Sequence, residues 1–175
     1  MAIDPDTFYG TVALGDTYFG ESLHETDWST ATSDRKERAL LAATKSVDAL
    51  VYAGYKTPVY DLLVADPDAT DEEIEAAAAT QLLEFPRDGS DTVPDDILFA
   101  VYEIARELLR GRDPQQEFEN LWIGSEGAGS TRASYDRAGM LPIRHLSNGI
   151  VSFYAWRFLQ PYLENQNSFD VRRVS

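Results

Sequence analysis

The most regular hydrophobic pattern lies in residues 95–109, where apolar positions recur at spacings of three and four. They are Ile97, Ala100, Val101, Ile104, Ala105, Leu108 and Leu109. This periodicity predicts an amphipathic helix whose inner face is fully buried. Pro94 suits the first helical position, and Gly111 follows the last apolar residue as a stop signal. Glu103 lies between the apolar positions, so we expect it to face solvent or a neighbouring chain.

Weaker helical patterns occur on both sides of this segment. One helix is predicted to begin near Asp34, with Glu37 as a capping-box partner, and to end at Gly54. Its apolar face would consist of Leu40, Ala43, Val47, Leu50 and Val51. Thr70 and Glu73 form a second capping-box pattern, which predicts a helix to about residue 83. Shorter helices are expected after Asp16, which would be the N-cap, over 114–122, and over 149–159 after a cap at Ser147 or Asn148. Trp28, in the loop after the first helix, is expected to anchor on the core.

The remaining segments show no helical period. Residues 1–10 are expected to be extended or mobile, and 55–69 to form a loop with one helical turn over 60–64. Residues 124–142 are rich in Gly and Ser, with weak strand character over 131–135. The predicted fold is therefore mainly α, a small bundle of four to five helices with a short β-segment or arm and an extended C-terminal tail. Residues 1–163 would form a single domain with a loop or β-arm insertion at 124–144, and 164–175 the tail.

Charge is distributed unevenly along the chain. The 175 residues, enough for one domain, carry a net charge of −15. Residues 61–103 contain thirteen acidic residues and a single basic one, Arg87. Nucleic-acid binding requires a basic face that displaces phosphate counterions, so this part of the chain disfavours tight DNA binding. Twelve Arg against three Lys, and seventeen Asp against thirteen Glu, resemble proteins from salt-loving hosts; the alternative is an acidic surface that only maintains solubility.

Residues typical of catalysis are scarce. The chain has no cysteine, and its two histidines, His24 and His145, each lack a second histidine at helical spacing. Gly124, Gly127 and Gly129 lack the lysine of a phosphate-binding loop. We therefore expect no enzymatic activity, no cofactor and no metal site. No apolar run approaches 18 residues, so no membrane span is expected either.

Several short motifs occur in a recognisable order. Thr17-Tyr18-Phe19 precedes Trp28, and a helix ends in Asp48-Ala49-Leu50-Val51-Tyr52-Ala53-Gly54. An aromatic-proline step, Glu84-Phe85-Pro86-Arg87, then leads through a polar loop to the Val93-Pro94 pair and the main helix. Ser125-Glu126-Gly127-Ala128-Gly129, Ser134-Tyr135-Asp136 and Leu159-Gln160-Pro161-Tyr162-Leu163 follow. Over about residues 11–163 this order resembles the head–tail connector (adaptor, or head completion) proteins of tailed viruses.

This resemblance implies a structural role in the virion. The protein would form a ring beneath the portal and extend the DNA channel toward the tail, and family resemblance implies a dodecamer. Its partners would be the portal protein, further copies of itself and the next neck or tail-completion protein, with genomic DNA passing transiently and without specificity. It would reside in the virion neck, and in the host cytoplasm during assembly. The resembled adaptors also carry a short β-segment or arm in the region of 124–142.

Candidate partner-binding residues lie at the C-terminal end and in the loop before the main helix. The segment 149–163 is densely aromatic, and large amphipathic rings are enriched at interfaces; the alternative is a fully buried helix. For binding the portal or a neighbouring subunit, the candidates are Trp156, Phe158, Tyr162, Phe169, Arg172 and Arg173. Asp88 and Asp91 are candidates to face the channel or the next neck protein. The basic residues Arg35, Lys36, Arg38 and Lys45 would either pair locally or meet an acidic patch on the next subunit.

The alternative function is a single-stranded-DNA-binding accessory protein, because some members of the resembled family carry that label. Tyr135 would serve as a stacking platform, flanked by Arg132, Arg137 and Arg144. Three arginines and one ring in a Gly-rich loop are a weak signal, since loop arginines are more often only solvated.

Overall fold

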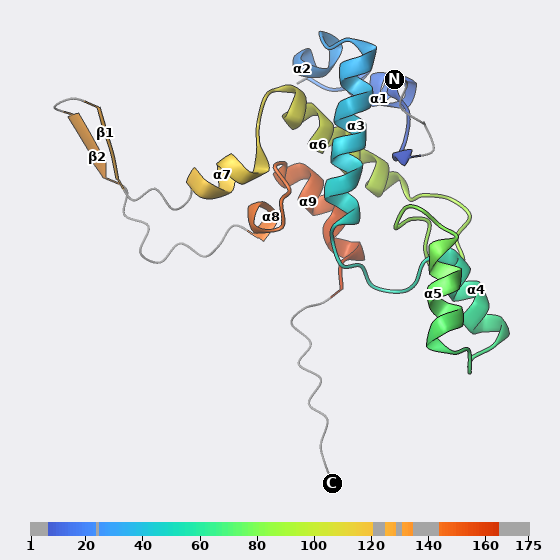
Figure 1. Ribbon diagram of the computed structural model, residues 1–175. Coiled ribbons are helices and arrows are strands. Elements are labelled where there is room, and N and C mark those ends of the chain that lie inside the picture. The colour runs from blue at the N-terminus through green and yellow to red at the C-terminus, as the bar shows by residue number, and fades with distance from the viewer. Residues whose placement is uncertain (1–6, 24, 121–124, 129–130, 135–143, 165–175) are drawn as a thin grey trace.

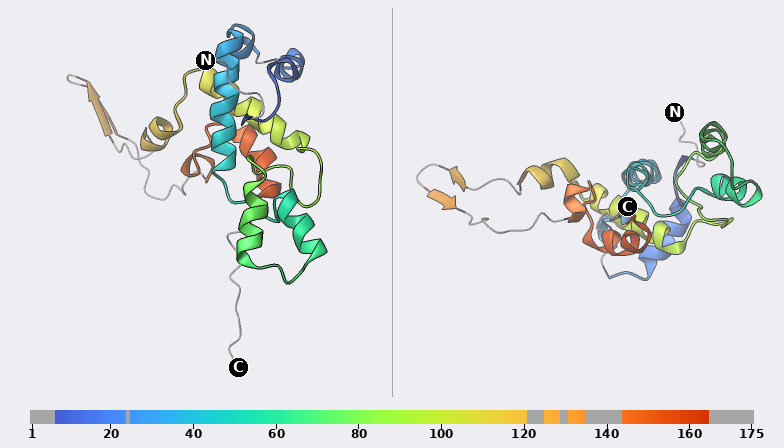
Figure 2. Two further views of the ribbon diagram at one scale, coloured as in Figure 1. Left: turned by 45° about the vertical axis from the view of Figure 1, so that its right-hand side comes forward. Right: turned by 90° about the horizontal axis from the view of Figure 1, so that it is seen from below.

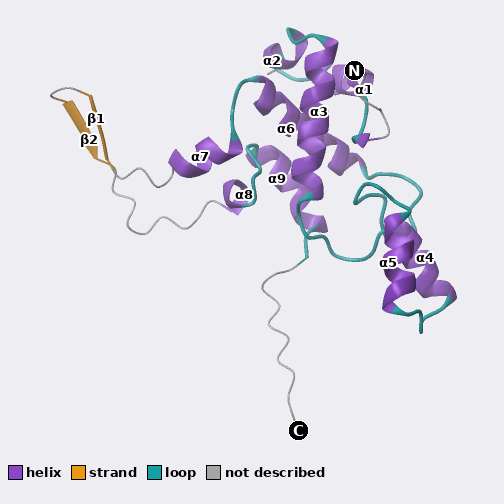
Figure 3. Ribbon diagram, in the orientation of Figure 1, coloured by secondary structure: helices purple, strands orange, loops and turns teal. Residues whose placement is uncertain are grey.

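A computed structural model describes residues 7–23, 25–120, 125–128, 131–134 and 144–164. The order of elements is α1 (Val12–Gly20), α2 (Thr26–Ser29), α3 (Ser33–Asp48), α4 (Thr57–Ala65), α5 (Asp71–Ala79), α6 (Asp95–Leu109), α7 (Pro114–Asn120), β1 (Ser125–Ala128), β2 (Thr131–Ser134), α8 (Arg144–Ser147), α9 (Phe153–Leu159) and a 3-10 turn (Gln160–Tyr162) (Figures 1 and 3). The chain is mainly α-helical, as predicted. Within the described residues it contains more and shorter helices than the four to five expected.

The core forms where α6 packs between α3 and α9 (Figure 1). Leu40, Ala43 and Val47 of α3 are fully buried or nearly so, as the apolar pattern predicted, whereas Val51, beyond the helix, is exposed. On α6 the fully buried residues are Ile97, Ala100, Val101, Ile104 and Ala105. Ala155 and Leu159 of α9 complete this apolar centre. The small side chains of α3 and α6 allow the two helices to approach closely.

Helix α6 ends just before Gly111 as predicted, and it begins one residue later than predicted, because Pro94 is not its first helical residue. Pro94 is its N-cap residue, and Asp95 and Asp96 lie in the first turn, where their negative charges interact favourably with the positive end of the helix dipole. Gly111 has φ +90°, a left-handed conformation that favours glycine and ends the helix.

The prediction that Glu103 faces solvent or a neighbouring chain was wrong, because this carboxylate is buried. Its Oε2 lies 2.7 Å from Arg106 Nη2, and its Oε1 accepts a hydrogen bond from the Tyr18 hydroxyl at 3.0 Å. Arg106 also pairs with Glu107 at 3.1 Å. A buried carboxylate is tolerated when a charge and a hydrogen-bond donor compensate it, and Tyr18 supplies the donor from a helix far away in sequence.

The N-terminal region also departs from its prediction. Phe8 and Tyr9 are buried in the core, although this segment was expected to be extended or mobile; residues 1–6 lie outside the described range. Asp16 is not a cap but lies within α1, whose N-cap is Thr11. Asp16 Oδ1 instead accepts hydrogen bonds from Lys36 Nζ at 2.6 Å and from the Trp28 indole at 2.7 Å.

Trp28 anchors on the core as predicted, although it lies in the short helix α2 and not in a loop. Its ring packs against Gly15, and a Cβ at that position would lie 2.5 Å from the indole. Helix α3 has Thr32 as its N-cap residue and no capping hydrogen bond from a side chain, so the box expected from Asp34 and Glu37 does not form.

Helices α4 and α5 pack against each other and form a lobe beside the core, which we call the α4–α5 lobe (Figure 2). The capping box at Thr70 and Glu73 is confirmed, with both reciprocal hydrogen bonds present. Helix α4 extends well beyond the single turn expected, because Pro58 in its first turn favours a helical start. In this lobe only Val59 is buried, and α5 buries no residue.

The remaining elements are short. Helix α7 confirms the helix expected after Asp113, and β1 and β2 pair as an antiparallel hairpin away from the helical body (Figure 1). The last helix begins later than predicted: α9 starts at Phe153 with a cap from Ser152. The short helix α8 precedes it where no helix was expected, and Gly149 separates the two with φ +75°. Ser147 and Asn148 are therefore not the caps of α9. The expected tail lies outside the described residues beyond Glu164.

No helix in the described part of the chain has both the length and the apolar character required to cross a membrane.

Candidate assembly surfaces

The aromatic segment of α9 and the following turn presents two groups of side chains. Trp156, Phe158 and Tyr162 are partly buried and pack against the core. The ring of Phe158 meets Phe99 at 5.8 Å, and the ring of Tyr162 meets Phe85 at 5.7 Å, both edge to face. These three candidates therefore contribute to the attachment of the C-terminal segment, and only part of each ring remains accessible to a partner.

Phe153 and Tyr154 have the opposite orientation. Their exposed fractions are 58% and 61%, while Ala155, the next residue, is fully buried. An aromatic pair exposed on a helix fixed in the core is a preorganised contact, because its backbone needs no further ordering on binding. In the sequence both rings belong to the densely aromatic segment 149–163, and neither is among the candidates predicted from it. The signal that separates them is their position: they precede Ala155 and Leu159, which face inward four residues apart.

Arg87 joins the α4–α5 lobe to the core, and we call its set of contacts the Arg87 clasp. Its Nη2 donates to the Gly54 carbonyl at 2.6 Å, and its Nε donates to the Ala53 carbonyl at 3.1 Å. Its Nη1 pairs with Glu84 Oε2 at 2.7 Å. The planar guanidinium satisfies several acceptors at once, which a lysine cannot do. The aromatic-proline-arginine step of the sequence thus has a structural role in fixing the chain on either side of the lobe.

Asp88, one of the candidates for facing a channel, is next to this clasp. It is exposed and has φ +55°, and its Oδ1 accepts a hydrogen bond from the Tyr55 amide at 2.8 Å. A Cβ on Gly54 would overlap the Asp88 carboxylate, so the two residues fit together only because position 54 is glycine. Asp91, the second candidate, is exposed in the same loop. Asp88 therefore holds the loop together while remaining accessible.

A buried network fastens the N-terminal segment to the same region. The Tyr9 hydroxyl donates to Asp48 Oδ1 at 2.5 Å and accepts from the Phe85 amide at 3.0 Å. Burial raises the pKa of Tyr9 and the pKa of Asp48, in the latter case against the lowering effect of the Tyr9 hydrogen bond. Near Asp16 the opposite holds, since the hydrogen bond from Lys36 lowers the pKa of that carboxyl group.

The surfaces of the α4–α5 lobe and of α3 also differ in charge. The α4–α5 lobe exposes seven acidic residues: Asp61, Asp66, Asp68, Asp71, Glu72, Glu73 and Glu75. Of the four basic residues on α3, Lys36 is buried and pairs with Asp16 at 2.6 Å. Arg35, Arg38 and Lys45 are exposed.

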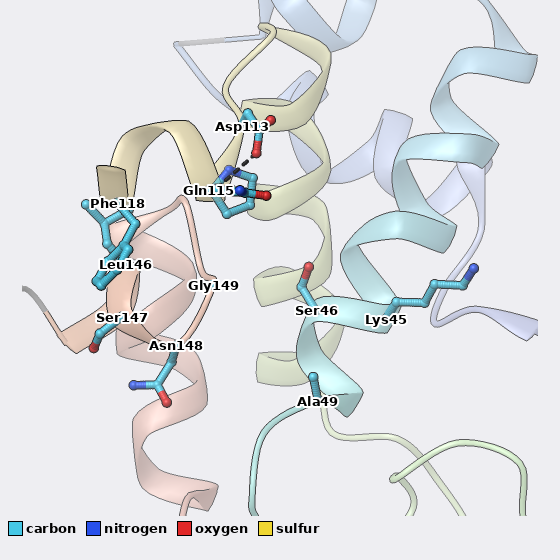
Figure 4. A pocket seen from close by; sticks show the side chains of 11 residues that line it. Lys45, Ser46, Ala49, Asp113, Gln115, Phe118, Leu146, Ser147, Asn148 and Gly149 are labelled. Atoms are coloured by element: carbon cyan, nitrogen blue, oxygen red, sulfur yellow. Dashed lines mark hydrogen bonds between the residues drawn. The ribbon is translucent and has the colours of Figure 1, made fainter. Parts of the chain in front are cut away.

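A pocket of about 490 Å³ lies between α3, the start of α7 and α8 (Figure 4). Phe118 and Leu146 point toward one another on one side, and Lys45 points away from the other labelled residues. Asp113, its only carboxylate, accepts a hydrogen bond from the Gln115 amide at 2.9 Å and so caps α7. The Asp113 carboxylate therefore serves as a local cap of α7.

The structure describes only some of the remaining candidates. Arg144 is exposed on α8 and Arg132 lies in β2, whereas Tyr135 and Arg137 are outside the described residues, as are Phe169, Arg172 and Arg173. His145 Nδ1 lies 2.8 Å from the Ile150 carbonyl oxygen, so it has a structural partner; His24 is not described. Among the described residues no group of three or more His, Cys, Asp or Glu could hold a metal ion.

Comparison with protein-family models, with curated proteins and with solved structures found no match for this chain.

Proposed function

We propose that the protein is a head–tail adaptor, a structural virion protein that forms a ring beneath the portal and extends the DNA channel toward the tail. The observation that carries this proposal is the exposed pair Phe153 and Tyr154 on a helix anchored in the core. Together with the order of sequence motifs, it favours a protein that binds other proteins through a rigid aromatic surface.

The anchoring of α9 supports this role. Ala155 and Leu159 are fully buried, and Phe158 contacts Phe99 of α6. A partner that binds Phe153 and Tyr154 is therefore connected to the main core without an intervening flexible segment. In the proposed adaptor these two rings supply the docking contact, and Trp156, Phe158 and Tyr162 mainly hold the helix in place.

The charge distribution is consistent with passage of DNA. The α4–α5 lobe carries acidic side chains without a basic residue, and a surface of this kind repels phosphate groups. A ring of such subunits, joined by head-to-tail contacts that close, would let DNA slide without adhering.

The decisive test is sedimentation and electron microscopy of the protein mixed with the portal ring of the same virus. We expect co-sedimentation and a ring of added density on the portal. Phe153→Ser combined with Tyr154→Ser should abolish binding while the circular dichroism spectrum is retained. Leu23→Ser is the matched control, because Leu23 is a large apolar residue that is almost fully exposed on another part of the surface.

A monomer that ignores the portal would overturn the proposal, as would equal loss of binding in the Leu23→Ser control. A gel-shift titration addresses the DNA-binding alternative. Submicromolar affinity with a steep salt dependence would indicate a nucleic-acid-binding protein instead.

A further inference from the structure

An apolar groove of about 640 Å³ lies between α1 and α6. Its lining residues are Leu14, Thr17, Tyr18, Glu21, Ser22, Asp95, Leu98, Phe99 and Tyr102. Tyr18 and Phe99 stack within it at a ring distance of 5.0 Å, and Leu14 is 52% exposed although it is apolar. A groove of this size with aromatic walls is typical of sites that bind small ligands or peptide side chains.

The charge of the groove has one sign. Glu21, the C-cap residue of α1, and Asp95 on α6 contribute carboxylates, and none of the described lining residues is basic. The other two pockets described, of about 490 Å³ each, both include Lys45. The α1–α6 groove therefore favours an occupant that combines apolar side chains with positive charge.

The C-terminal sequence has this composition. Residues 165–175, NQNSFDVRRVS, contain three apolar residues and two adjacent arginines, Arg172 and Arg173. In an extended chain Phe169 and Val171 project to the same side. Asp170 is the single acidic residue in the segment.

The last described residues lie close enough for this segment to reach the groove. The Tyr162 hydroxyl is 3.4 Å from Asp96 Oδ2, and Asp96 adjoins the groove residue Asp95. An extended chain covers about 3.3 Å per residue, so Phe169 is within roughly 20 Å of Leu163. The groove residues of α6 span only about 10 Å of helix, at 1.5 Å per residue.

We propose that in the free protein the α1–α6 groove binds residues 165–175 of the same chain, with Phe169 and Val171 against Tyr18 and Phe99, and the two arginines near Glu21 and Asp95. This inference does not depend on the adaptor function, because it rests on the groove, its charge and the reach of the chain. It assigns the C-terminal residues an intramolecular site, which any external partner of this segment has to displace.

Disulfide trapping tests the proposal on the full chain, which contains no natural cysteine. Thr17 is exposed on the rim of the groove, so Thr17→Cys is combined with Ser168→Cys. We expect an intramolecular disulfide to form about tenfold faster than in Thr80→Cys with Ser168→Cys, since binding raises the local concentration of the segment. Thr80 is exposed at the end of α5, outside the groove.

Equal rates for the two pairs would overturn the proposal, and so would cross-linking only between chains, which would assign the groove to a second copy. The charge contribution has its own matched test. Glu21→Gln with Asp95→Asn should slow trapping roughly threefold, the size expected for exposed ion pairs. Asp61→Asn with Glu75→Gln makes the same change of net charge on the α4–α5 lobe and should leave the rate unchanged.

A spin label gives a measurement that does not depend on disulfide geometry. With the label on Asp170→Cys, the amide signals of Leu14, Thr17 and Leu98 should broaden, while those of α5 stay sharp. Broadening confined to residues near Leu163 would show that the segment does not enter the groove.

Discussion

The α3–α6–α9 core and the α4–α5 lobe are stabilised in different ways. In the core, the inward faces of all three helices include residues with no exposed surface. In the lobe, Val59 is the one buried residue and α5 has none. The core helices therefore depend on burial of apolar surface. The lobe depends on helix caps, on contact between its two helices and on the Arg87 clasp.

This difference shows which changes each region tolerates. A charge introduced into the core has no water and no partner, whereas the same charge on the lobe remains solvated. Loss of the Arg87 clasp, in contrast, should affect the lobe first, because the hydrogen bonds of Arg87 fix the chain just before α4 and just after α5.

The largest effect is expected for Ile104→Asp. Ile104 is fully buried, so an unpaired carboxylate in its place should destabilise the fold by more than about 4 kcal/mol, enough to unfold the domain. Val64→Asp is the comparison in the lobe, where the side chain is 67% exposed. Its free energy of unfolding in urea should match the parent protein, and equal destabilisation by both changes would contradict the distinction between the regions.

Arg87→Ala should have the next largest effect, about 3 kcal/mol, because it leaves the partly buried Glu84 carboxylate and several carbonyls without this donor. Hydrogen exchange should accelerate most in residues 52–65. Arg87→Lys should recover only part of the loss, since one ammonium cannot replace the guanidinium fork.

Arg35→Ala, at an exposed position of α3, is the control for loss of an arginine. If exchange in Arg87→Ala rises uniformly across the chain, the clasp is part of the core and not a specific attachment of the lobe.

Asp16 and Asp48 should change the stability of the protein with pH in opposite directions. Asp16 has a lowered pKa, so its contribution to stability is present above the usual value of 3.8 and is lost as pH falls through the folded-state pKa. Asp16→Asn should cost about 1 kcal/mol at pH 7, because solvent partly screens the half-exposed carboxylate that accepts hydrogen bonds from Lys36 and Trp28. The cost should decrease as pH falls through the folded-state pKa of Asp16.

Asp48 has a raised pKa, so its ionisation opposes folding as pH rises above 3.8. Asp48→Asn should therefore equal the parent protein in stability near pH 3 and exceed it at pH 7. Urea unfolding measured across this range checks both variants. The same sign of pH dependence for the two would contradict the assignment.

The smallest effect is expected for Thr70→Ala. Its side chain accepts the Glu73 amide in the capping box, so its loss should cost about 1 kcal/mol and fray α5. Because α5 buries no residue, the unfolding midpoint of the core should not move, while amide exchange in the first turn of α5 should increase. A shift of the global midpoint would mean that the lobe and core unfold together.

The sequence predicted those parts of the fold that depend on neighbouring residues. The boundaries of α6 follow from Pro94, Gly111 and the apolar spacing, and the capping box of α5 follows from Thr70 and Glu73. The predictions failed where partners come from distant elements. Asp16 resembles a cap in sequence, yet its partner is Lys36, and no local pattern indicates that Glu103 meets Tyr18.

The candidate surfaces were predictable to a similar degree. An aromatic C-terminal segment was evident, but the side of α9 that each ring occupies depends on where α6 lies against it. The motif around Arg87 contributes to the family resemblance in the sequence. Its structural role became evident only from the positions of the Gly54 and Ala53 carbonyls. Both the orientation of the α9 rings and the role of Arg87 depend on tertiary contacts, which the periodicity of the sequence does not reveal.

The clasp has a consequence for how this chain can diverge. Arg87 binds the segment that leads into the lobe through main-chain oxygen atoms at positions 53 and 54, so its contact with residue 53 does not depend on the side chain at that position. Residues 57–79 can then exchange their surface chemistry over many generations while the lobe keeps its orientation. The side chains on the surface of the lobe and the main-chain contacts that fix its orientation can therefore change independently.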